Sequence, residues 1–205
     1  MTDPTLCEFT AQLASAQPAP GGGGAAALTG ALAASLAAMA ANVTAANPRN
    51  AAFRSALSVM AAACDEQRTA LLALIEADAA GFLPLQQAYA IPKTDPDRAA
   101  RLAAAARTAC QAPLDMLTHC AQIIMLLDAA RDIISPLLRS DIGCAAALCR
   151  AAAEAAAMNV FVNTRLLAPA DRAETEALAE QLRASIVRSC TRTVNAVRKQ
   201  LLGEG

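Results

Sequence analysis

The sequence predicts an all-α protein, a multihelical bundle of six to eight helices forming a single domain over residues 1–205. Alanine, the strongest helix former, supplies 56 of the 205 residues. Aromatic residues, which favour strands, make up 2% of the chain. A hydrophobic content of 56% against 17% charged residues excludes a disordered chain. The net charge of −1 leaves no basic surface for nucleic acid, so no nucleic-acid partner is expected.

The first half of the chain predicts three helices. A Thr-x-x-Glu capping box starts a short helix over about 5–16, which ends at a Pro-Ala-Pro segment. Four glycines form a turn, and a second helix over about 24–46 ends at an Asn-Pro pair. The third helix covers about 49–89, and Pro84 inside it is expected to kink or break it near Phe82.

The second half predicts four more helices. A proline-containing loop over 91–96 precedes a helix over about 97–108. Pro113 suits the first turn of the next helix, over about 113–134, because a first-turn residue needs no intrahelical N–H bond. A Ser-Pro pair breaks the chain again. The last two helices are expected over about 139–167 and 169–202.

Targeting and redox features point to the cytoplasm. Residues 21–46 carry no charge and are long enough to cross a bilayer, but Ala, Gly, Ser, Thr and Asn favour insertion only weakly. We therefore expect a buried helix and no membrane partner. The N-terminus lacks the basic segment of a secretory signal. Seven cysteines without a close pair, and a single histidine, predict reduced core thiols and no metal site.

Two carboxylates occur where apolar residues are expected. Asp78 continues an apolar stripe of the third predicted helix, and burial would raise the pKa of its carboxyl group. A plain structural interpretation is an ion pair with an arginine or a cap on a neighbouring helix. Asp141 also has apolar neighbours at helical spacing, and its structural interpretation is a helix N-cap after the Ser-Pro break.

Several other polar features have a functional and a structural interpretation. Asn42 lies on the side of its helix that carries the larger side chains, and Asn159 and Asn163 project from one helix face. These amides either contact a ligand or form hydrogen bonds between helices. The glycine turn at 21–24 leads into a helix N-terminus, which can bind an anion or simply let two helices pack. His119 is more typical of a structural histidine than of a catalytic one.

Four segments, taken together, resemble the formiminotetrahydrofolate cyclodeaminase / methenyltetrahydrofolate cyclohydrolase family. They follow one another in the order of that family and span residues 18–163, so the resemblance covers most of the chain. The four segments are Pro18-Ala-Pro-Gly-Gly-Gly-Gly-Ala-Ala-Ala with the helix ending Asn42-Val-Thr44, Asp78-Ala-Ala-Gly-Phe82, Ala88-Tyr-Ala-Ile-Pro-Lys93, and Ser140-Asp141-Ile-Gly through Asn159-Val-Phe-Val-Asn163.

The resemblance implies an all-helical homodimer that acts on a tetrahydrofolate derivative without a metal. Members either hydrolyse 5,10-methenyltetrahydrofolate to 10-formyltetrahydrofolate or cyclise 5-formiminotetrahydrofolate with loss of ammonia. The wording of the glycine segment looks closest to the cyclohydrolases, so hydrolysis is the first expectation and deamination the alternative. A non-catalytic helical module for folate binding or assembly is a more distant alternative.

The resemblance and the chemistry together suggest roles for the polar residues. A carboxylate whose pKa is raised toward neutrality can take a proton from water and return it to a leaving nitrogen. Which of the two carboxylates is the base stays open. We expect Asp141 and Asp78 to act as acid and base. The pterin or the bridging carbon is expected to contact Asn42, Ser140, Asn159 and Asn163. The glutamate carboxylates of the folate are expected to contact Lys93 and the amides of Gly21, Gly22, Gly23 and Gly24.

Overall fold

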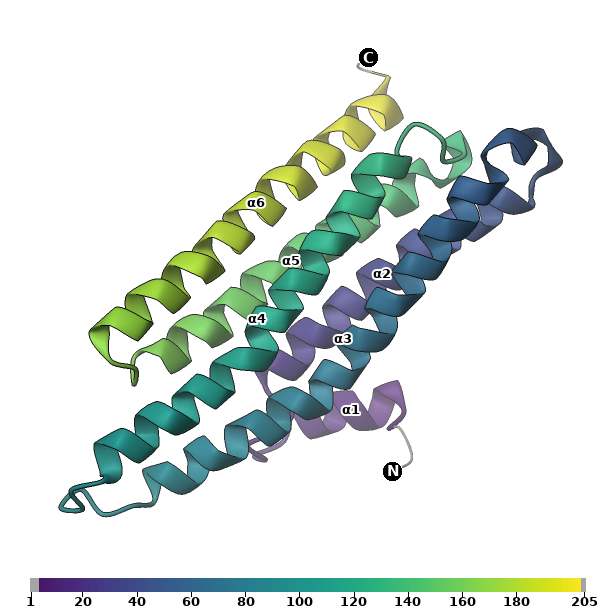
Figure 1. Ribbon diagram of the computed structural model, residues 1–205. Coiled ribbons are helices and arrows are strands. Elements are labelled where there is room, and N and C mark those ends of the chain that lie inside the picture. The colour runs from purple at the N-terminus through teal and green to yellow at the C-terminus, as the bar shows by residue number, and fades with distance from the viewer. Residues whose placement is uncertain (1–3, 204–205) are drawn as a thin grey trace.

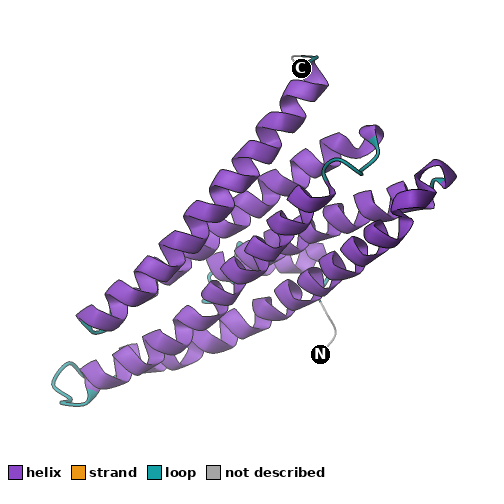
Figure 2. Cartoon of the chain, turned by 45° about the horizontal axis from the view of Figure 1, so that its top comes forward, coloured by secondary structure: helices purple, strands orange, loops and turns teal. Residues whose placement is uncertain are grey.

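The computed structural model describes residues 4–203 and contains only helices and connecting loops over that range. The prediction of an all-α fold with six to eight helices is confirmed (Figure 2). In chain order the elements are α1 (Leu6–Leu13), α2 (Gly22–Ala46), the 3₁₀ helix η1 (Pro48–Phe53), α3 (Arg54–Tyr89), α4 (Arg98–Ala130), the 3₁₀ helix η2 (Pro136–Leu138), α5 (Arg139–Thr164) and α6 (Pro169–Leu202).

The five long helices lie side by side, and short α1 lies on the outside of the bundle near the N-terminal end of α2 (Figure 1). Helix α2 packs between α3 and α5, α4 covers α3 and α5, and α6 packs on α5 and α4. The loop between α3 and α4 extends beyond the ends of the neighbouring helices (Figure 1). Buried Phe9 of α1 faces Gly24, so α1 seals the N-terminal end of α2.

Two prolines lie inside continuous helices, so the chain has no break near Phe82 and the helix boundary predicted before Pro113 is wrong. Helix α3 runs through Pro84 without a break, and α4 joins the two helices predicted on either side of Pro113. A proline removes the hydrogen bond to the carbonyl four residues earlier. For Pro113 that carbonyl belongs to buried Ala109, and the Nδ2 of Asn163 donates to it at 3.0 Å. The side chain of α5 thus replaces the missing backbone donor of α4.

Helix α2 buries its small residues and exposes its larger ones. Its buried positions are all glycine, alanine or threonine, which lets α3 and α5 approach its backbone closely. The larger side chains share one side, as their spacing predicts, but that side faces outward: Leu32 is 46% and Val43 is 52% exposed. The core of the bundle is therefore thin, and apolar surface is left on its outside.

The structure differs in part from the predictions about membrane-length helices and about buried cysteines. Three helical segments of the described chain are long and apolar enough to cross a membrane, rather than one: Gly22–Ala46, Pro48–Tyr89 and Pro136–Thr164. The first of them, α2, packs against both of the helices α3 and α5 that the other two contain. All seven cysteines are free, and five are buried as predicted; Cys7 and Cys144 are exposed, so the prediction of core thiols is wrong for these two.

Candidate active site

A small polar pocket lies where the N-terminus of α2 meets α3, α4 and the C-terminal end of α5. Its volume is about 170 Å³, and it contains one carboxylate and two carboxamides. Three segments distant in sequence, all singled out by the sequence analysis, converge there. The lining residues are Pro18, Ala19, Gly21, Gly22, Gly23, Asp78, Ala79, Phe82, Ala109, Asn159, Val162 and Asn163.

Asp78 supplies the only titratable side chain among the residues that line this pocket. It is half-buried on α3, and within residues 4–203 no hydrogen bond or ion pair engages its carboxylate. Burial therefore raises the pKa of Asp78 above its usual value, because desolvation disfavours the charged form. The structural interpretation of Asp78 as an arginine partner or a helix cap is wrong. An unpaired carboxylate in a pocket is typical of a functional site.

The glycines at the start of α2 let its backbone reach the polar side chains of the pocket. A Cβ on Gly23 would overlap the carboxyl group of Asp78, and a Cβ on Gly22 would lie 3.3 Å from the carboxamide of Asn159. The first-turn amides of a helix have no intrahelical acceptor. The Gly turn thus brings free N–H groups, at the positive end of the α2 dipole, beside Asp78.

Two asparagines of α5 line the opposite wall, one helical turn apart. The Nδ2 of Asn159 donates to the carbonyl of Ala155 at 2.8 Å, and the Nδ2 of Asn163 donates to that of Ala109 at 3.0 Å. Each Nδ2 therefore uses one of its two N–H groups for a backbone acceptor, and the two Oδ1 atoms remain as acceptors for a ligand. The prediction that these residues project together is confirmed, and their hydrogen bonds serve packing as well.

Comparisons with known proteins match both the sequence and the fold. A family model described as Formiminotransferase-cyclodeaminase matches residues 5–184. A methenyltetrahydrofolate cyclohydrolase from Methylorubrum extorquens is 34% identical over 182 residues, covering 87% of this chain and 86% of the relative. The chain belongs to the formiminotransferase-cyclodeaminase family. Its fold matches a crystal structure of formiminotetrahydrofolate cyclodeaminase from Thermotoga maritima, with a TM-score of 0.87, 24% identity and coverage of 97% and 98% of the two chains.

Three of the predicted site residues lie at the other end of the bundle. Asp141 is in the first turn of α5, 18 residues before Asn159, or about 27 Å along the helix axis. Asn42 is similarly remote from Gly23 along α2. The amide of Ser135 donates to the Oγ1 of Thr44 at 3.1 Å, so the end of α2 and the start of α5 adjoin. Within one chain, Asp78 therefore shares no pocket with Asn42, Ser140 or Asp141.

Asp141 is also not the helix cap of its structural interpretation. The N-cap of α5 is Leu138, which makes Asp141 the third residue of the helix. A carboxylate there interacts favourably with the helix dipole.

Lys93 lies in the exposed α3–α4 loop, outside the pocket. Asp78, Phe82 and Tyr89 share one side of α3 that leads toward this loop, over about 16 Å.

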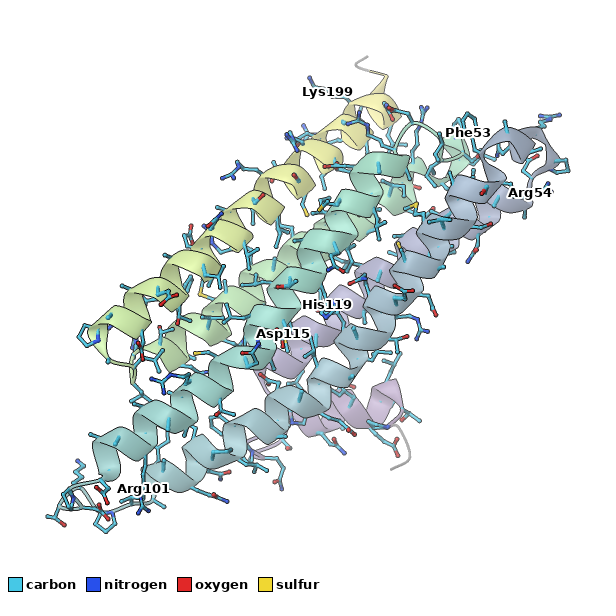
Figure 3. All side chains as sticks on the ribbon, viewed as in Figure 1. Phe53, Arg54, Arg101, Asp115, His119 and Lys199 are labelled. Carbon is cyan, nitrogen blue, oxygen red and sulfur yellow. The ribbon has the colours of Figure 1, made fainter. Side chains whose placement is uncertain are left out.

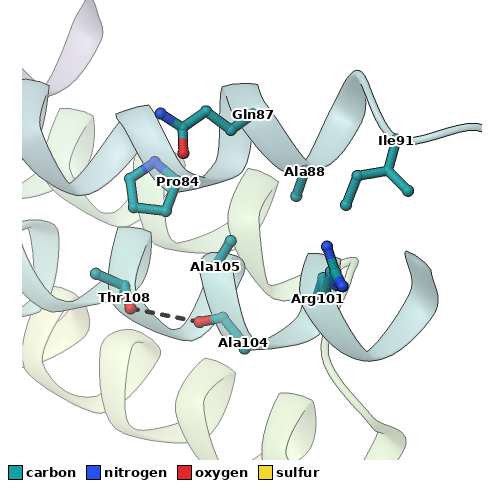
Figure 4. Close-up of a pocket in the computed structure, with 8 residues that line it drawn as sticks. All are labelled: Pro84, Gln87, Ala88, Ile91, Arg101, Ala104, Ala105 and Thr108. Carbon is teal, nitrogen blue, oxygen red and sulfur yellow. Dashed lines mark hydrogen bonds between the residues drawn. The ribbon is translucent and has the colours of Figure 1, made fainter. Parts of the chain in front are cut away.

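A second cavity, larger than the Asp78 pocket, lacks a group that could transfer a proton. A groove of about 450 Å³ lies between the C-terminal half of α3 and the N-terminal half of α4 (Figure 4). Arg101 is the only charged side chain that lines it, and no carboxylate, histidine or cysteine does. The groove therefore lacks a group for proton transfer, whereas the smaller pocket contains one.

His119 lies near Asp115 on α4 (Figure 3) and is not among the residues that line the Asp78 pocket. Its Nδ1 lies 2.7 Å from the Oε1 of buried Gln67, and Gln111 donates to Asp115 one turn earlier on α4. Burial lowers the pKa of His119, and the nearby charge of Asp115 opposes that shift. This arrangement favours the structural interpretation of His119.

Sequence reasoning missed three apolar contributors to the pocket: Phe82, Ala109 and Val162. Phe82 belongs to the Asp-x-x-x-Phe segment but carries no polar signal of its own. Ala109 gives no signal in a chain with 56 alanines. Val162 lies between the two asparagines along α5 and is 58% exposed beside the pocket. Helical spacing did not predict this exposure of an apolar side chain.

Proposed function

We propose that this protein hydrolyses 5,10-methenyltetrahydrofolate to 10-formyltetrahydrofolate. The observation that carries the proposal is the unpaired, half-buried Asp78 in a pocket with two carboxamide acceptors. The relative at 34% identity, named methenyltetrahydrofolate cyclohydrolase, supports this reaction over others of the family. The alternative is cyclodeamination of 5-formiminotetrahydrofolate, the activity named for the structure with the similar fold.

The reaction needs one base and a positioned water. The methenyl bridge is an amidinium carbon, which is electrophilic and carries positive charge. Asp78 takes a proton from water as the water oxygen bonds to this carbon, and the proton then goes to the nitrogen whose bond to the carbon breaks. A carboxyl group with a raised pKa suits both steps, because its carboxylate is a stronger base than that of an ordinary aspartate and its acid form can return the proton.

The remaining pocket residues fit the binding of a reduced pterin. The ring presents N–H and amino donors, and the free Oδ1 atoms of Asn159 and Asn163 are acceptors. The start of α2 lies against Asp78, so we assign the amides of Gly22 and Gly23 to the pocket rather than to the glutamate end of the substrate. We assign the glutamate carboxylates to Lys93, which the Phe82–Tyr89 side of α3 leads toward.

Parallel assays with the two folates test the proposal. We expect the wild-type protein to remove the methenyl absorbance without releasing ammonia. Asp78→Asn should slow this turnover by about two orders of magnitude or more, the effect typical of losing a general base. Ammonia release from 5-formiminotetrahydrofolate would identify the cyclodeaminase instead. Binding of either folate without turnover would identify the non-catalytic module, and neither binding nor turnover would overturn the folate assignment.

We further propose a metal-free homodimer of the cytoplasm, with no membrane or nucleic-acid partner. Proton transfer by Asp78 is sufficient for hydrolysis, so dialysis against a chelator should leave turnover unchanged.

Lys93→Ala should raise KM several-fold with little change in kcat, because Lys93 contacts the substrate far from the reacting carbon. A loss of kcat in Lys93→Ala would contradict this assignment.

A further inference from the structure

The two asparagines of the Asp78 pocket have the same chemistry but different anchors. The Nδ2 of Asn159 donates to the carbonyl of Ala155, one turn earlier on its own helix, at 2.8 Å. The Nδ2 of Asn163 donates instead to α4, to the carbonyl of Ala109 at 3.0 Å. A helical asparagine can bond to its own preceding turn without help from a neighbour. The anchor of Asn163 therefore needs a cause on α4.

That cause is Pro113, which leaves the carbonyl of Ala109 without a helical donor. In a regular helix the N–H of residue 113 would bond to this carbonyl, but proline has no N–H. The proline ring also crowds the carbonyl four residues earlier and turns it away from the helix axis. Pro113 and Ala109 are both buried, and a buried carbonyl needs a donor. Asn163 supplies this donor from α5.

The bond to Ala109 decides which end of the Asn163 carboxamide faces the pocket. A free carboxamide can turn about its last side-chain bond and present either its oxygen or its NH₂ group. With the Nδ2 held on Ala109, the Oδ1 is left as an acceptor for a ligand. Ala109 and Asn163 both line the pocket, so the anchor lies in the pocket wall itself. An acceptor is thereby fixed where the proposed substrate presents N–H and amino donors.

We propose that Pro113 is a positioning residue for substrate binding, because the Ala109 carbonyl that it frees holds the Asn163 carboxamide with its oxygen toward the pterin. Pro113 is not among the residues that line the pocket and acts through Ala109 and Asn163. The identity of the ligand rests on the proposed function, whereas the Pro113–Ala109–Asn163 arrangement does not depend on it. The other interior proline, Pro84, lacks this role because the carbonyl it frees belongs to exposed Ala80, outside the pocket lining.

The expected effect of this positioning is on substrate binding rather than on the chemical step. The Asn163 oxygen contacts the pterin, not the reacting carbon, so its hydrogen bond has the same strength before and during the reaction. Loss of such a bond raises KM and leaves kcat unchanged. An acceptor that is already oriented also loses less side-chain freedom when the ligand binds. Removing the anchor should therefore weaken binding even though Asn163 is still present.

Steady-state kinetics with 5,10-methenyltetrahydrofolate test the proposal through a double-mutant cycle. Pro113→Ala gives residue 113 an N–H that takes back the Ala109 carbonyl, so KM should rise about three- to fivefold with kcat unchanged. Asn163→Ala should raise KM about tenfold. The double variant should have the KM of Asn163→Ala alone, because the proline then has no side chain left to position. Multiplied effects on KM, or an unchanged KM in Pro113→Ala, would overturn the proposal.

Thermal unfolding separates positioning from a general loss of structure. Pro113→Ala places the best helix former in the middle of α4, so its Tm should not fall although KM rises. Pro84→Ala is the matched control, because it makes the same change inside α3, and it should leave KM unchanged. A KM that rises equally in both variants, or rises only together with a lower Tm, would contradict the positioning role.

Nuclear magnetic resonance tests the anchor without any turnover. With ¹⁵N-labelled asparagine, the Nδ2 signals of Asn163 are identified by their absence in Asn163→Ala. Their hydrogen exchange with solvent should be at least tenfold faster in Pro113→Ala than in the wild-type protein, while the Nδ2 signals of Asn159 are the internal control and should not change. Equal exchange rates of Asn163 in the two proteins would overturn the proposal. Because this measurement needs no substrate, it stays decisive if the protein turns over neither folate and the proposed function fails.

Discussion

At the scale of single residues, the proposed function depends on one carboxylate that has no partner in the described chain. Asp78 has no ion pair or hydrogen bond in the described chain, and its pKa is raised by desolvation. Sequence periodicity predicted that Asp78 would lie on an apolar side of its helix, and this is confirmed. Periodicity could not decide whether an arginine would neutralise the carboxylate, because that depends on which side chains of other helices come near.

Asp78 should make activity and stability respond to pH in opposite directions. Turnover is expected to fall with decreasing pH at values above the ordinary aspartate range, as the base becomes protonated. The ionised carboxylate is less favourable in the folded chain than in the unfolded one, so this group lowers stability as pH rises through its folded pKa. Asp78→Asn should therefore raise Tm at pH 7. The difference should vanish below the ordinary pKa of aspartate, where the carboxyl is neutral in both states; an equal gap at every pH would contradict the assignment.

Gly23 should be the most sensitive of the helix glycines. A Cβ there would overlap the carboxyl group of Asp78, so Gly23→Ala should displace that side chain or the start of α2 and reduce turnover at least tenfold. Gly81→Ala is the matched control: its Cβ would lie 3.5 Å from the carbonyl of Thr108, an ordinary contact, and replacing a helical glycine should add about 0.5–1 kcal/mol of stability. Steady-state kinetics and thermal unfolding of both variants measure these effects, and equal kinetics would contradict the role of Gly23.

At the scale of elements, the sequence predicted the number and order of the helices well and their boundaries less well. The helix continues through Pro84, where a kink or a break was predicted, and through Pro113, where a boundary was predicted, for one physical reason. A proline ends a helix only if the carbonyl it leaves free cannot find another donor. Ala80 is exposed and can use water, and Ala109 uses Asn163 of α5. A donor from a distant helix is invisible to local sequence patterns.

A double-mutant cycle tests the pairing of Pro113 with Asn163. Asn163→Ala should cost about 1–3 kcal/mol of unfolding free energy, because it leaves the buried Ala109 carbonyl without a donor. Pro113→Ala restores the backbone N–H, which can then bond that carbonyl. The cost of Asn163→Ala should consequently be smaller in the Pro113→Ala background, as denaturant unfolding would measure. Additive effects would show that the two residues act independently.

At the scale of the whole molecule, the side of a helix on which a residue lies was easier to predict than its position relative to residues of other helices. Helical spacing assigns a residue to a side of its helix, but not to a position along the bundle relative to other helices. Asp141 and Asn159 therefore share a side of α5 and still lie about 27 Å apart. In α2 both sides are apolar, so the sequence also left open which side faces outward. A bundle with small residues inside and large ones outside leaves apolar surface exposed, and the proposed homodimer would bury part of it.

Thermal unfolding should accordingly depend on protein concentration. If the exposed apolar side of α2 is buried between two copies in the proposed homodimer, folding and association are linked, and dilution shifts the equilibrium toward separated chains. We expect Tm to fall as the protein is diluted over two to three orders of magnitude, with specific activity falling in parallel. Leu32→Glu, which places a charge on that exposed side of α2, should leave a monomer whose Tm no longer varies with concentration and whose turnover is reduced, although Asp78 is unchanged. The matched substitution Leu178→Glu, at an exposed leucine of α6, should retain the concentration dependence and the activity. A Tm of the wild-type protein that is constant across this range, with activity retained at the lowest concentration, would mean that one chain suffices for catalysis.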